Sequence, residues 1–403
     1  MKFVKYLRDF GIEPVVFTVK DPDYAITDES LADEIPEGVE VLKQSIWEPN
    51  QLLSKFKSKQ QHTSAGFLNP KPSFFERQLH YIRANFFIPD ARKFWIKPSV
   101  ETLTNYLNEH PVDLIITTGP PHSTHLIGLQ LKEALKLKWI ADFRDPWTDI
   151  DYFHQLPLTE RSKKKHKELE EKVLRGADAI LVVGKTMQEN YKKFNKNTYV
   201  ISNGFDTSEK TIKVKLNKKF SLTHVGMMNA DRDPEILWEV LNEMNTEVKG
   251  FKEDLQVNLI GKVAEGVKKS IEKRYLSGFV QFIDYVPHQK VMAYQRSSQI
   301  LLLSVNQVPS AKGIITGKIF EYLQAGRPIL ALAPEDGDLA AIIEKTQSGK
   351  VIGFKDWEKL KKTIKEYYLL YKNNNLNIRS DNIEQYHRRN LTKKLSEIIK
   401  RTK

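Results

Sequence analysis

Short apolar runs of strand type alternate with stretches of helical periodicity along almost the whole chain. Leu114–Thr117 and Ile300–Leu303 are runs of the first kind, and Ser123–Leu135 is a stretch of the second. This alternation is typical of parallel sheets, because each pair of neighbouring parallel strands is joined by a helical crossover. At 403 residues the chain is also too long for one ordinary core. We therefore predict an α/β protein with two domains.

The predicted elements are spread over both halves of the chain. The strands of the first half are Pro14–Val19, Leu114–Thr117, Trp139–Asp142, Ala179–Val183 and Tyr199–Ser202, and its helices include Ser123–Leu135, Glu160–Arg175 and Lys185–Phe194. The strands of the second half are Ser221–Val225, Val257–Ile260, Val280–Ile283, Ile300–Leu303, Ile329–Leu332 and Lys350–Ile352. Helices are predicted between them at Pro234–Met244, Lys290–Gln295, Gly317–Ala325 and Leu339–Lys345. The two halves therefore read as two similar α/β units.

A polar, lysine-rich stretch from Asp206 to Lys219 has weak periodicity and is the best linker candidate. We therefore predict a first domain of residues 1–205 and a second domain of residues 206–375. The chain from Trp357 onward is charged and of helical pattern, and we assign residues 376–403 to a C-terminal helical tail.

The basic composition favours anionic partners. The formal net charge is +12, which suits nucleotide diphosphates, polyprenyl-phosphate lipids, an anionic membrane or nucleic acid. A solubilising lysine-rich surface is the alternative interpretation. The chain has no cysteine, which excludes disulfides and thiolate metal sites. No apolar run reaches the roughly 18 residues of a membrane span, and no nucleic-acid-binding motif is evident. We expect a soluble or peripheral protein that does not bind nucleic acid.

Residues 51–100 differ from the rest of the first domain. They contain few strand signals and many basic and aromatic residues. The aromatic residues are Phe74, Phe75, Tyr81, Phe86, Phe87, Phe94 and Trp95, and they interleave with Arg77, Arg83, Arg92 and Lys93. Basic residues beside aromatic ones suit a membrane interface or a lipid-phosphate acceptor. The alternative is an ordinary helical insertion with its own core.

Lys318–Leu330 reads as a short helix followed directly by an apolar strand. Gly326 suits the residue after the helix because it tolerates positive φ, and Pro328 cannot extend the helix. The carboxylate of Glu321 can accept two hydrogen bonds from a sugar diol. Free backbone N–H groups at the helix start, together with Lys318, can face a phosphate. A solvated helix residue is the alternative for Glu321.

Three other loops follow predicted strands. His224–Pro234 contains Gly226, where the backbone can approach a pyrophosphate, and Arg232, which can neutralise it. Thr117–His125 and Ala141–Trp147 follow two strands of the first half. The carboxyl ends of parallel strands are where open α/β sheets bind ligands. Either histidine of the first of these two loops can instead be an ordinary structural residue.

Several of these segments resemble glycosyltransferases of family 4, which have the GT-B fold. Tyr199–Asp206 is similar to the hinge segment of that family, and Lys318–Leu330 is similar to its nucleotide-sugar site. The Gly119-Pro120-Pro121 and Asp142–Trp147 segments resemble the "S-P-P" and "D-F-R-D-P-W" pattern of a bacterial polysaccharide branch. The resemblance implies two Rossmann-like domains that face a central cleft. It also implies a C-terminal helix that crosses back to the first domain.

The resemblance assigns roles to individual residues. It places Gly226 and Arg232 at the donor diphosphate, Lys318 nearby, and Glu321 on the donor ribose. On the other side it implies catalytic roles for His122, Arg144 and Asp145, with His125 near the acceptor. The family often carries a second glutamate eight positions before the ribose-binding one. Here that position is Gly313, so one expected donor contact is missing.

The implied activity is retaining transfer of a sugar from a nucleotide diphosphate to a saccharide or polyprenyl-phosphate-linked acceptor. The setting is cell-surface polysaccharide synthesis such as that of lipopolysaccharide, in the cytoplasm or peripherally on the inner face of the membrane. Asp-x-Asp triplets occur at Asp21–Asp23, Asp149–Asp151 and Asp336–Asp338, as they do in many turns. We expect no metal and no cofactor, because helix dipoles and basic side chains supply the electrostatics in this fold.

The start of the chain departs from the family pattern. Lys2–Pro14 resembles the end of the first helix and the second strand, so the first strand and its glycine-rich loop have no counterpart. We expect this to leave a gap in the first sheet. A catalytically inactive nucleotide-binding remnant therefore stays an alternative. A nucleotide-sugar epimerase of the same fold is another.

Overall fold

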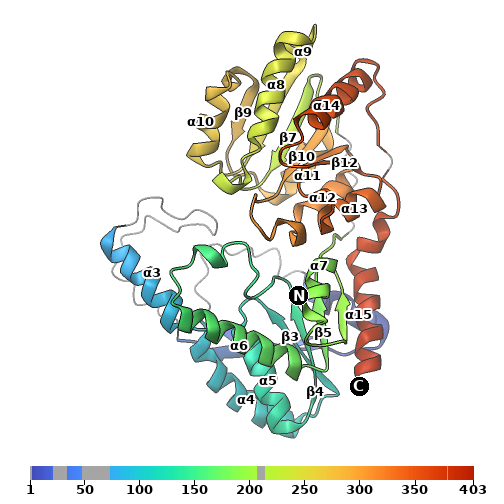
Figure 1. Cartoon of the computed structure of the whole chain (residues 1–403). Coiled ribbons are helices and arrows are strands. Elements are labelled where there is room, and N and C mark those ends of the chain that lie inside the picture. The colour runs from blue at the N-terminus through green and yellow to red at the C-terminus, as the bar shows by residue number, and fades with distance from the viewer. Residues whose placement is uncertain (1, 21–33, 48–72, 207–213, 379) are drawn as a thin grey trace. The chain divides into compact units, whose positions relative to one another are not determined.

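The computed structural model describes residues 2–20, 34–47, 73–206, 214–378 and 380–403. The chain forms two compact units (Figure 1). Unit 1 comprises Met1–Asn203 and Arg388–Lys403, and unit 2 comprises Gly204–His387. The division falls two residues before the one that we predicted. Residues 207–213 of the predicted linker lie outside the described residues.

Unit 2 contains one sheet of six parallel strands in the order β12-β11-β10-β7-β8-β9. In chain order within the unit this is 6-5-4-1-2-3, the strand order of a Rossmann fold read from its other edge. The strands are β7 (Phe220–Val225), β8 (Leu255–Ile260), β9 (Val280–Ile283), β10 (Ile300–Ser304), β11 (Ile329–Leu332) and β12 (Gly349–Ile352). The helices are α8 (Glu235–Glu247), α9 (Phe251–Asp254), α10 (Glu265–Lys273), α11 (His288–Ser297), α12 (Lys318–Ala325), α13 (Asp338–Lys345) and α14 (Trp357–Lys372).

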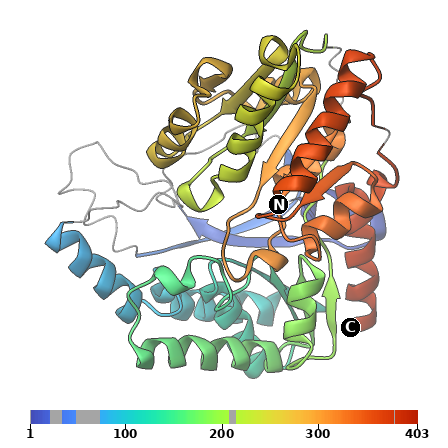
Figure 2. The same cartoon turned by 45° about the horizontal axis from the view of Figure 1, so that its top comes forward.

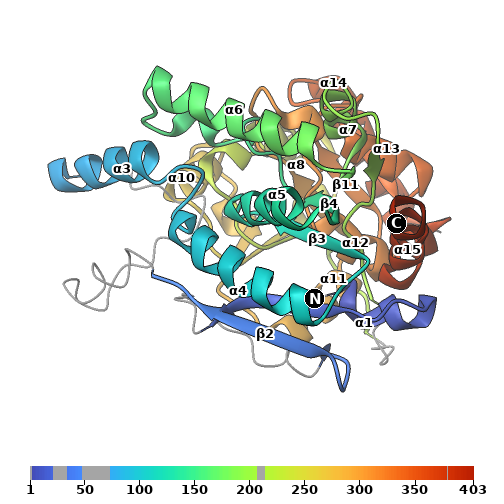
Figure 3. The ribbon, with the colours of Figure 1, turned by 90° about the horizontal axis from the view of Figure 1, so that it is seen from below.

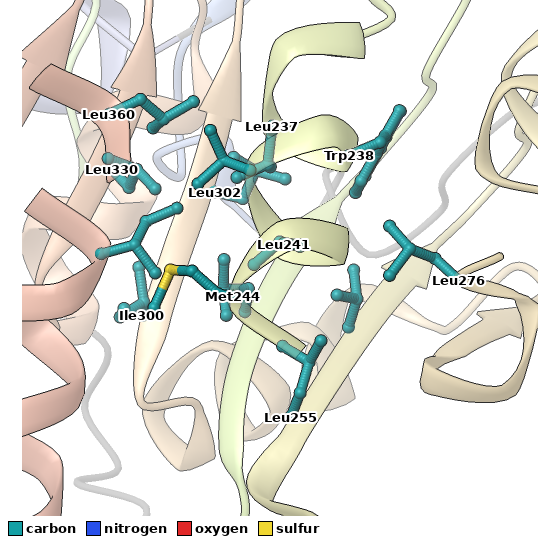
Figure 4. Packing of buried hydrophobic residues seen from close by; sticks show 14 of the residues in the cluster. Leu237, Trp238, Leu241, Met244, Leu255, Leu276, Ile300, Leu302, Leu330 and Leu360 are labelled. Atoms are coloured by element: carbon teal, nitrogen blue, oxygen red, sulfur yellow. The ribbon is translucent and has the colours of Figure 1, made fainter. Parts of the chain in front are cut away.

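Both faces of this sheet are covered. Successive residues of a strand point to opposite faces, so one strand supplies two cores. Leu302 packs with α8 and α14 on one face, whereas Leu301 and Leu303 pack with α12 and α13 on the other. Figure 4 shows the first core, where Trp238 and Met244 of α8 lie over the strands. All five residues of β10 are buried, as expected of a central parallel strand.

Unit 1 contains two separate parallel sheets. One pairs β1 (Val15–Lys20) with β2 (Glu40–Ser45). The other has the order β3-β4-β5-β6, with strands β3 (Leu114–Gly119), β4 (Lys138–Phe143), β5 (Ala179–Val182) and β6 (Thr198–Val200). Among the described residues, no strand joins β1 to β3 (Figure 2). This confirms the expected gap in the first sheet.

Helices complete unit 1. They are α1 (Val4–Leu7), α3 (Phe74–Phe86), α4 (Ile96–Glu109), α5 (Ser123–Leu135), α6 (Glu160–Gly176), α7 (Lys185–Tyr191) and α15 (Arg388–Thr402). Figure 3 shows α4 and α5 side by side, where Leu103 and Leu107 share a core with Ile127. The C-terminal helix α15 packs on this unit through Leu391 and Leu395, which contact the core that includes Leu7. Within the described ranges, no helix is long and apolar enough to cross a membrane.

Candidate functional site

The strand order of unit 2 defines where a ligand can bind. The crossovers from β7 run toward β8 and β9, and those from β10 run toward β11 and β12, so the order reverses between β7 and β10. Loops diverge from the carboxyl ends of the strands at such a switch point and leave room for a ligand. Gly226 follows β7, and Asn306 lies two residues after β10.

Gly226 turns the chain sharply as it leaves β7. Its φ is +106°, which residues with a side chain rarely adopt. Its N–H donates to the carbonyl of Ile260 at 2.7 Å. A methyl group at this position would overlap Cε of Lys318 and lie 3.0 Å from its Nζ. A glycine is therefore required both for the turn and for the approach of the lysine.

Lys318 begins α12 and extends over the Gly226 turn. Burial lowers the pKa of its amine to about 8, and the nearby charge of Arg232 lowers it further, while Glu321 acts in the opposite direction. Within the described part of the chain, the amine has no hydrogen-bond acceptor. A half-buried cation with no acceptor favours the binding of an anion at this point.

Arg232 lies in the same loop as Gly226. Its Nε donates to Oδ1 of Asn306 at 3.0 Å, and its Nη1 donates to the carbonyl of Met227 at 3.1 Å. The N–H of Gln307 donates to the carbonyl of Asp231 at 2.7 Å. These bonds connect the loops that follow β7 and β10 across the switch point. Arg232 therefore adds positive charge to the site and also holds the two loops together.

Helix α12 is fixed against the sheet by a buried tyrosine. The hydroxyl of Tyr322 accepts a hydrogen bond from the N–H of Val225 at 3.1 Å and donates to the carbonyl of Leu302 at 3.3 Å. One side chain thus ties α12 to both β7 and β10. The first turn of α12 carries Lys318 and Glu321, so Tyr322 sets their position relative to the Gly226 turn.

Glu321 is held by a residue that we did not predict from the sequence. The fully buried Gln295 of α11 donates from Nε2 to Oε2 of Glu321 at 3.0 Å. The Oε1 atom of Gln295 has no partner among the described residues. The contact fixes one carboxylate oxygen of Glu321. In the sequence, this contact is marked only by one glutamine in a predicted helix. That signal is too weak to predict that Gln295 holds Glu321.

The four residues predicted for the donor therefore converge in unit 2. The site offers two cations, the N-terminal end of a helix and a carboxylate in its first turn. Such a set can bind a diphosphate and a neighbouring diol. Gly313, in place of the second glutamate, lies in a short turn in which Lys312 forms a 2.7 Å ion pair with Asp336.

The residues predicted for the acceptor side lie in unit 1, and most of them are engaged within the protein. Arg144 donates from Nε to both carboxylate oxygens of the buried Asp142, at 2.8 and 3.0 Å. Its Nη1 donates to the carbonyl of Ile201 at 3.1 Å, and its guanidinium lies over the ring of Phe3. These bonds show that Arg144 holds the loop after β4, and its catalytic role stays a prediction.

The two histidines at the start of α5, His122 before the helix and His125 in its first turn, are also enclosed. His125 is fully buried, its Nδ1 lies 2.9 Å from the hydroxyl of Thr117, and its ring stacks on Phe143. An acceptor cannot reach this side chain, which corrects the acceptor-side expectation for His125. His122 is 8% exposed and stacks on Trp147 with ring centroids 4.7 Å apart. Burial lowers the pKa of His122 to about 3, so its imidazole is neutral.

Asp145 is the predicted residue of unit 1 that stays accessible. The residue is exposed, yet neighbouring atoms limit the hydration of its carboxyl and raise its pKa, and the charge of Asp151 raises it further. The buried carboxylate of Glu170 holds this loop in place. It accepts hydrogen bonds from the hydroxyls of Thr148 at 2.5 Å and Tyr191 at 2.7 Å. Asp145 is therefore the acceptor-side candidate that the geometry leaves available.

The structure also shows how the potential metal ligands of the described residues are arranged. Across the described ranges, no three histidine, aspartate or glutamate side chains are grouped as metal ligands. Of the three Asp-x-Asp triplets, Asp21–Asp23 lies outside the described residues. Asp336 is paired with Lys312, and Asp338 is buried in the first turn of α13. The positive charges of the candidate site are those of Lys318 and Arg232.

The sequence profile of the Glycosyltransferase Family 4 matches residues 58–209. This segment is therefore similar to the family-4 glycosyltransferases. No curated protein matches it. The matched residues cover most of unit 1 and end before β7, so the roles of the unit 2 residues rest on their geometry.

Solved structures of glycosyltransferases show that the chain has the GT-B fold. WaaG, a glycosyltransferase involved in lipopolysaccharide biosynthesis, is 13% identical with a TM-score of 0.57, over 99% of this chain and 94% of WaaG. Sucrose-phosphate synthase from Thermosynechococcus elongatus is 15% identical with a TM-score of 0.55, over 96% of each chain. TarM from S. aureus, in a complex that contains UDP, is 14% identical with a TM-score of 0.51, over 74% of this chain and 58% of TarM. The predicted fold class is confirmed.

Proposed function

We propose that the chain is a glycosyltransferase that takes its sugar from a nucleotide-diphosphate donor bound in unit 2 and transfers it with retention of anomeric configuration. The observation that carries the proposal is the position of Lys318. Its half-buried amine lies over the Gly226 turn at the switch point, has no acceptor among the described residues, and has a pKa lowered to about 8. A bound diphosphate supplies the missing negative charge.

The other residues of the site fit the remaining parts of such a donor. Arg232 contributes a second positive charge to the diphosphate, and the first N–H groups of α12 add the positive end of the helix dipole. Glu321 accepts hydrogen bonds from the ribose hydroxyls with the oxygen that Gln295 does not hold. These groups also stabilise the charge that develops on the leaving diphosphate as the glycosidic bond breaks.

Retention requires the acceptor to attack from the face that the diphosphate leaves. In the proposed mechanism the acceptor hydroxyl loses its proton to the departing phosphate, so no protein nucleophile forms a bond to the sugar. Asp145 in unit 1 is proposed to orient the acceptor, and the enclosed His122 contributes a neutral ring at the edge of the same loop. No cofactor or metal enters this proposal.

We further propose a saccharide or polyprenyl-phosphate-linked acceptor and a role in cell-surface polysaccharide synthesis. WaaG acts in lipopolysaccharide biosynthesis, and TarM was crystallised with alpha-GlcNAc-glycerol, which supports a saccharide acceptor by analogy of fold. The net charge of +12 suits a phosphate-bearing acceptor and the inner face of the cell membrane. We propose that the enzyme works there, in the cytoplasm.

The test is incubation of the chain with UDP-, GDP- and ADP-sugars and saccharide acceptors, followed by mass spectrometry and NMR. The proposal predicts an acceptor that is heavier by one sugar unit, free nucleotide diphosphate, and an anomeric carbon configured as in the donor. An isomerised sugar on an intact nucleotide would instead identify an epimerase. Nucleotide binding without any turnover would identify an inactive remnant.

A further inference from the structure

Helix α3 of unit 1 carries an exposed apolar stripe. None of its 13 residues is buried. Phe75, Leu79, Ile82 and Phe86 are spaced by four, three and four residues, so they lie on one face of the helix. Phe75 is 79% exposed, Ile82 44% and Phe86 63%. A 13-residue helix that buries none of its large apolar side chains is unusual for a helix that only serves a core.

The helix is well defined although it lacks a core contact. Ser73 and Glu76 form a capping box at its start, with bonds of 2.8 and 3.2 Å between side chain and backbone. At its other end, Asn85 donates to the carbonyl of Pro157 and accepts from the N–H of Thr159, both at 2.8 Å. In Figures 1 and 3 the helix projects from the edge of unit 1. It is therefore a structured element that is fastened to unit 1 near its C-terminal end.

The polar side of α3 is cationic. Arg77 and Arg83 are both exposed. The only acidic residue of the helix is Glu76, and its carboxylate accepts the capping bond from Ser73. An apolar stripe with aromatic side chains next to arginines is the pattern of helices that lie in the plane of a membrane interface.

A second aromatic group extends this surface beyond the end of α3. Trp47 and Phe94 are 51% and 43% exposed, and their ring centroids are 5.0 Å apart. Lys93 lies over the rings of Phe87 and Phe94 and donates to the carbonyl of Phe86, the last residue of α3. Tryptophan and phenylalanine beside a lysine are favoured at the depth of lipid headgroups.

We propose that α3 docks the enzyme on an anionic lipid bilayer. Phe75, Ile82 and Phe86 enter the boundary between headgroups and acyl chains, and Arg77 and Arg83 bind lipid phosphates. A second copy of the chain is the weaker occupant, because pairing two α3 stripes would bring the arginines of both copies together. The inference deepens the proposed membrane setting but does not depend on the donor site, since every residue that it uses lies in unit 1.

The test is flotation of the full chain with phosphatidylcholine vesicles, with and without phosphatidylglycerol. We expect binding to the anionic vesicles, and a drop of at least about tenfold in the partition coefficient for Phe75→Ser/Phe86→Ser. Arg77→Gln and Arg83→Gln should each weaken binding about fivefold, and only to the anionic vesicles. The matched controls are Phe282→Ser and Arg175→Gln, exposed residues outside this surface that should leave binding unchanged.

Equal flotation of the wild type and Phe75→Ser/Phe86→Ser would overturn the proposal, as would absence of binding to the anionic vesicles. A concentration-dependent dimer that this double variant abolishes would assign the stripe to a second copy instead. UDP titration of the same variants without vesicles separates the two proposals. We expect a double variant that no longer binds vesicles but still binds UDP. If the wild type itself did not bind UDP, that result would count against the donor site only.

Discussion

The two units reach their candidate sites in different ways. In unit 2, one turn and one helix bring Gly226, Lys318 and Glu321 together at the switch point of an unbroken six-stranded sheet. In unit 1, the sheet is split between β1 and β3. Two of the four predicted residues, Arg144 and His125, use polar atoms in hydrogen bonds to other residues of the unit. The comparison teaches that a site marked by a glycine turn and a helix start is easier to locate than one whose polar residues also hold the fold together.

The largest expected effect distinguishes a structural role of Arg144 in unit 1 from a catalytic one. Arg144→Leu leaves the buried carboxylate of Asp142 without its charged partner and with only the hydroxyl of Thr118 as a donor, so we expect the free energy of unfolding to fall by about 3–5 kcal/mol. Urea unfolding measures this change. Arg175→Leu, which removes an exposed ion pair with Glu171, should cost less than about 1 kcal/mol.

A double replacement sharpens this prediction. Asp142→Leu with Arg144→Leu removes both charges and should recover a large part of the lost stability. Unchanged stability of Arg144→Leu, together with lost transfer activity, would return the arginine to the catalytic role.

The second effect concerns the turn on which the donor site of unit 2 depends. Gly226→Ala places a methyl group on Cε of Lys318 and strains a φ of +106°, so we expect UDP affinity to fall about 30-fold, a loss of about 2 kcal/mol. Gly266→Ala is the matched control, because a methyl group there meets no atom within 4 Å and alanine favours its helix. Equal UDP affinity of the two variants would remove the Gly226 turn from the site.

The third effect is a pH dependence that belongs to unit 2 alone. The amine of Lys318, with its pKa of about 8, must be charged to hold a diphosphate, so UDP affinity should fall about tenfold between pH 7 and 9. Stability without nucleotide should change in the opposite direction. Because the folded pKa lies below the unfolded 10.5, the unfolded chain binds more protons between these values and the folded chain gains stability as pH rises.

Calorimetric titration of two lysine variants checks the pH effect. Lys318→Arg keeps its charge throughout this range, so the pH profile should flatten. Lys318→Met should bind UDP weakly at every pH. A profile that is still steep in Lys318→Met would assign the titration to another group.

The smallest effect tests the support of the ribose contact. Gln295→Met fills a similar volume but removes the hydrogen bond to Glu321, and we expect a loss of about fivefold in UDP affinity. Gln324→Met is the matched control, since Gln324 lies on the same helix as Glu321 but donates to the carbonyl of Asp206. Equal affinities in the two variants would show that Glu321 does not need the buried amide.

Much of this molecule could be predicted from local sequence. Val280–Ile283 and Ile329–Leu332 are strands with the predicted bounds, because apolar runs between turn residues identify buried parallel strands. The strand β2 was missed, since Glu40–Ser45 is short and mostly polar, with only Val41 and Leu42 apolar and no alternation between them and the polar residues. The pattern of residues 51–100 left two interpretations open, and its described part, from Ser73, contains the exposed helix α3 and the packed helix α4.

The candidate donor site of unit 2 was predictable because backbone geometry determines the positions of its residues. In many α/β proteins, a glycine after a strand and a lysine at a helix start indicate a site for an anion. The enclosure of His125 and the pairing of Arg144 depend on residues 8 and 2 positions away that could equally have faced a ligand. Gln295 was missed because its contact joins two helices through residues that are 26 positions apart in the chain.

The central claim is that unit 2 binds a nucleotide-diphosphate sugar through Glu321 and the cations beside it. The most direct measurement is calorimetric titration of the wild type, Glu321→Ala and Asp145→Asn with UDP, GDP and ADP. We predict saturable binding of one of these nucleotides, at least about tenfold weaker in Glu321→Ala and unchanged in Asp145→Asn of unit 1. Binding that is unaffected by Glu321→Ala, or no binding of any of the three, would contradict the account.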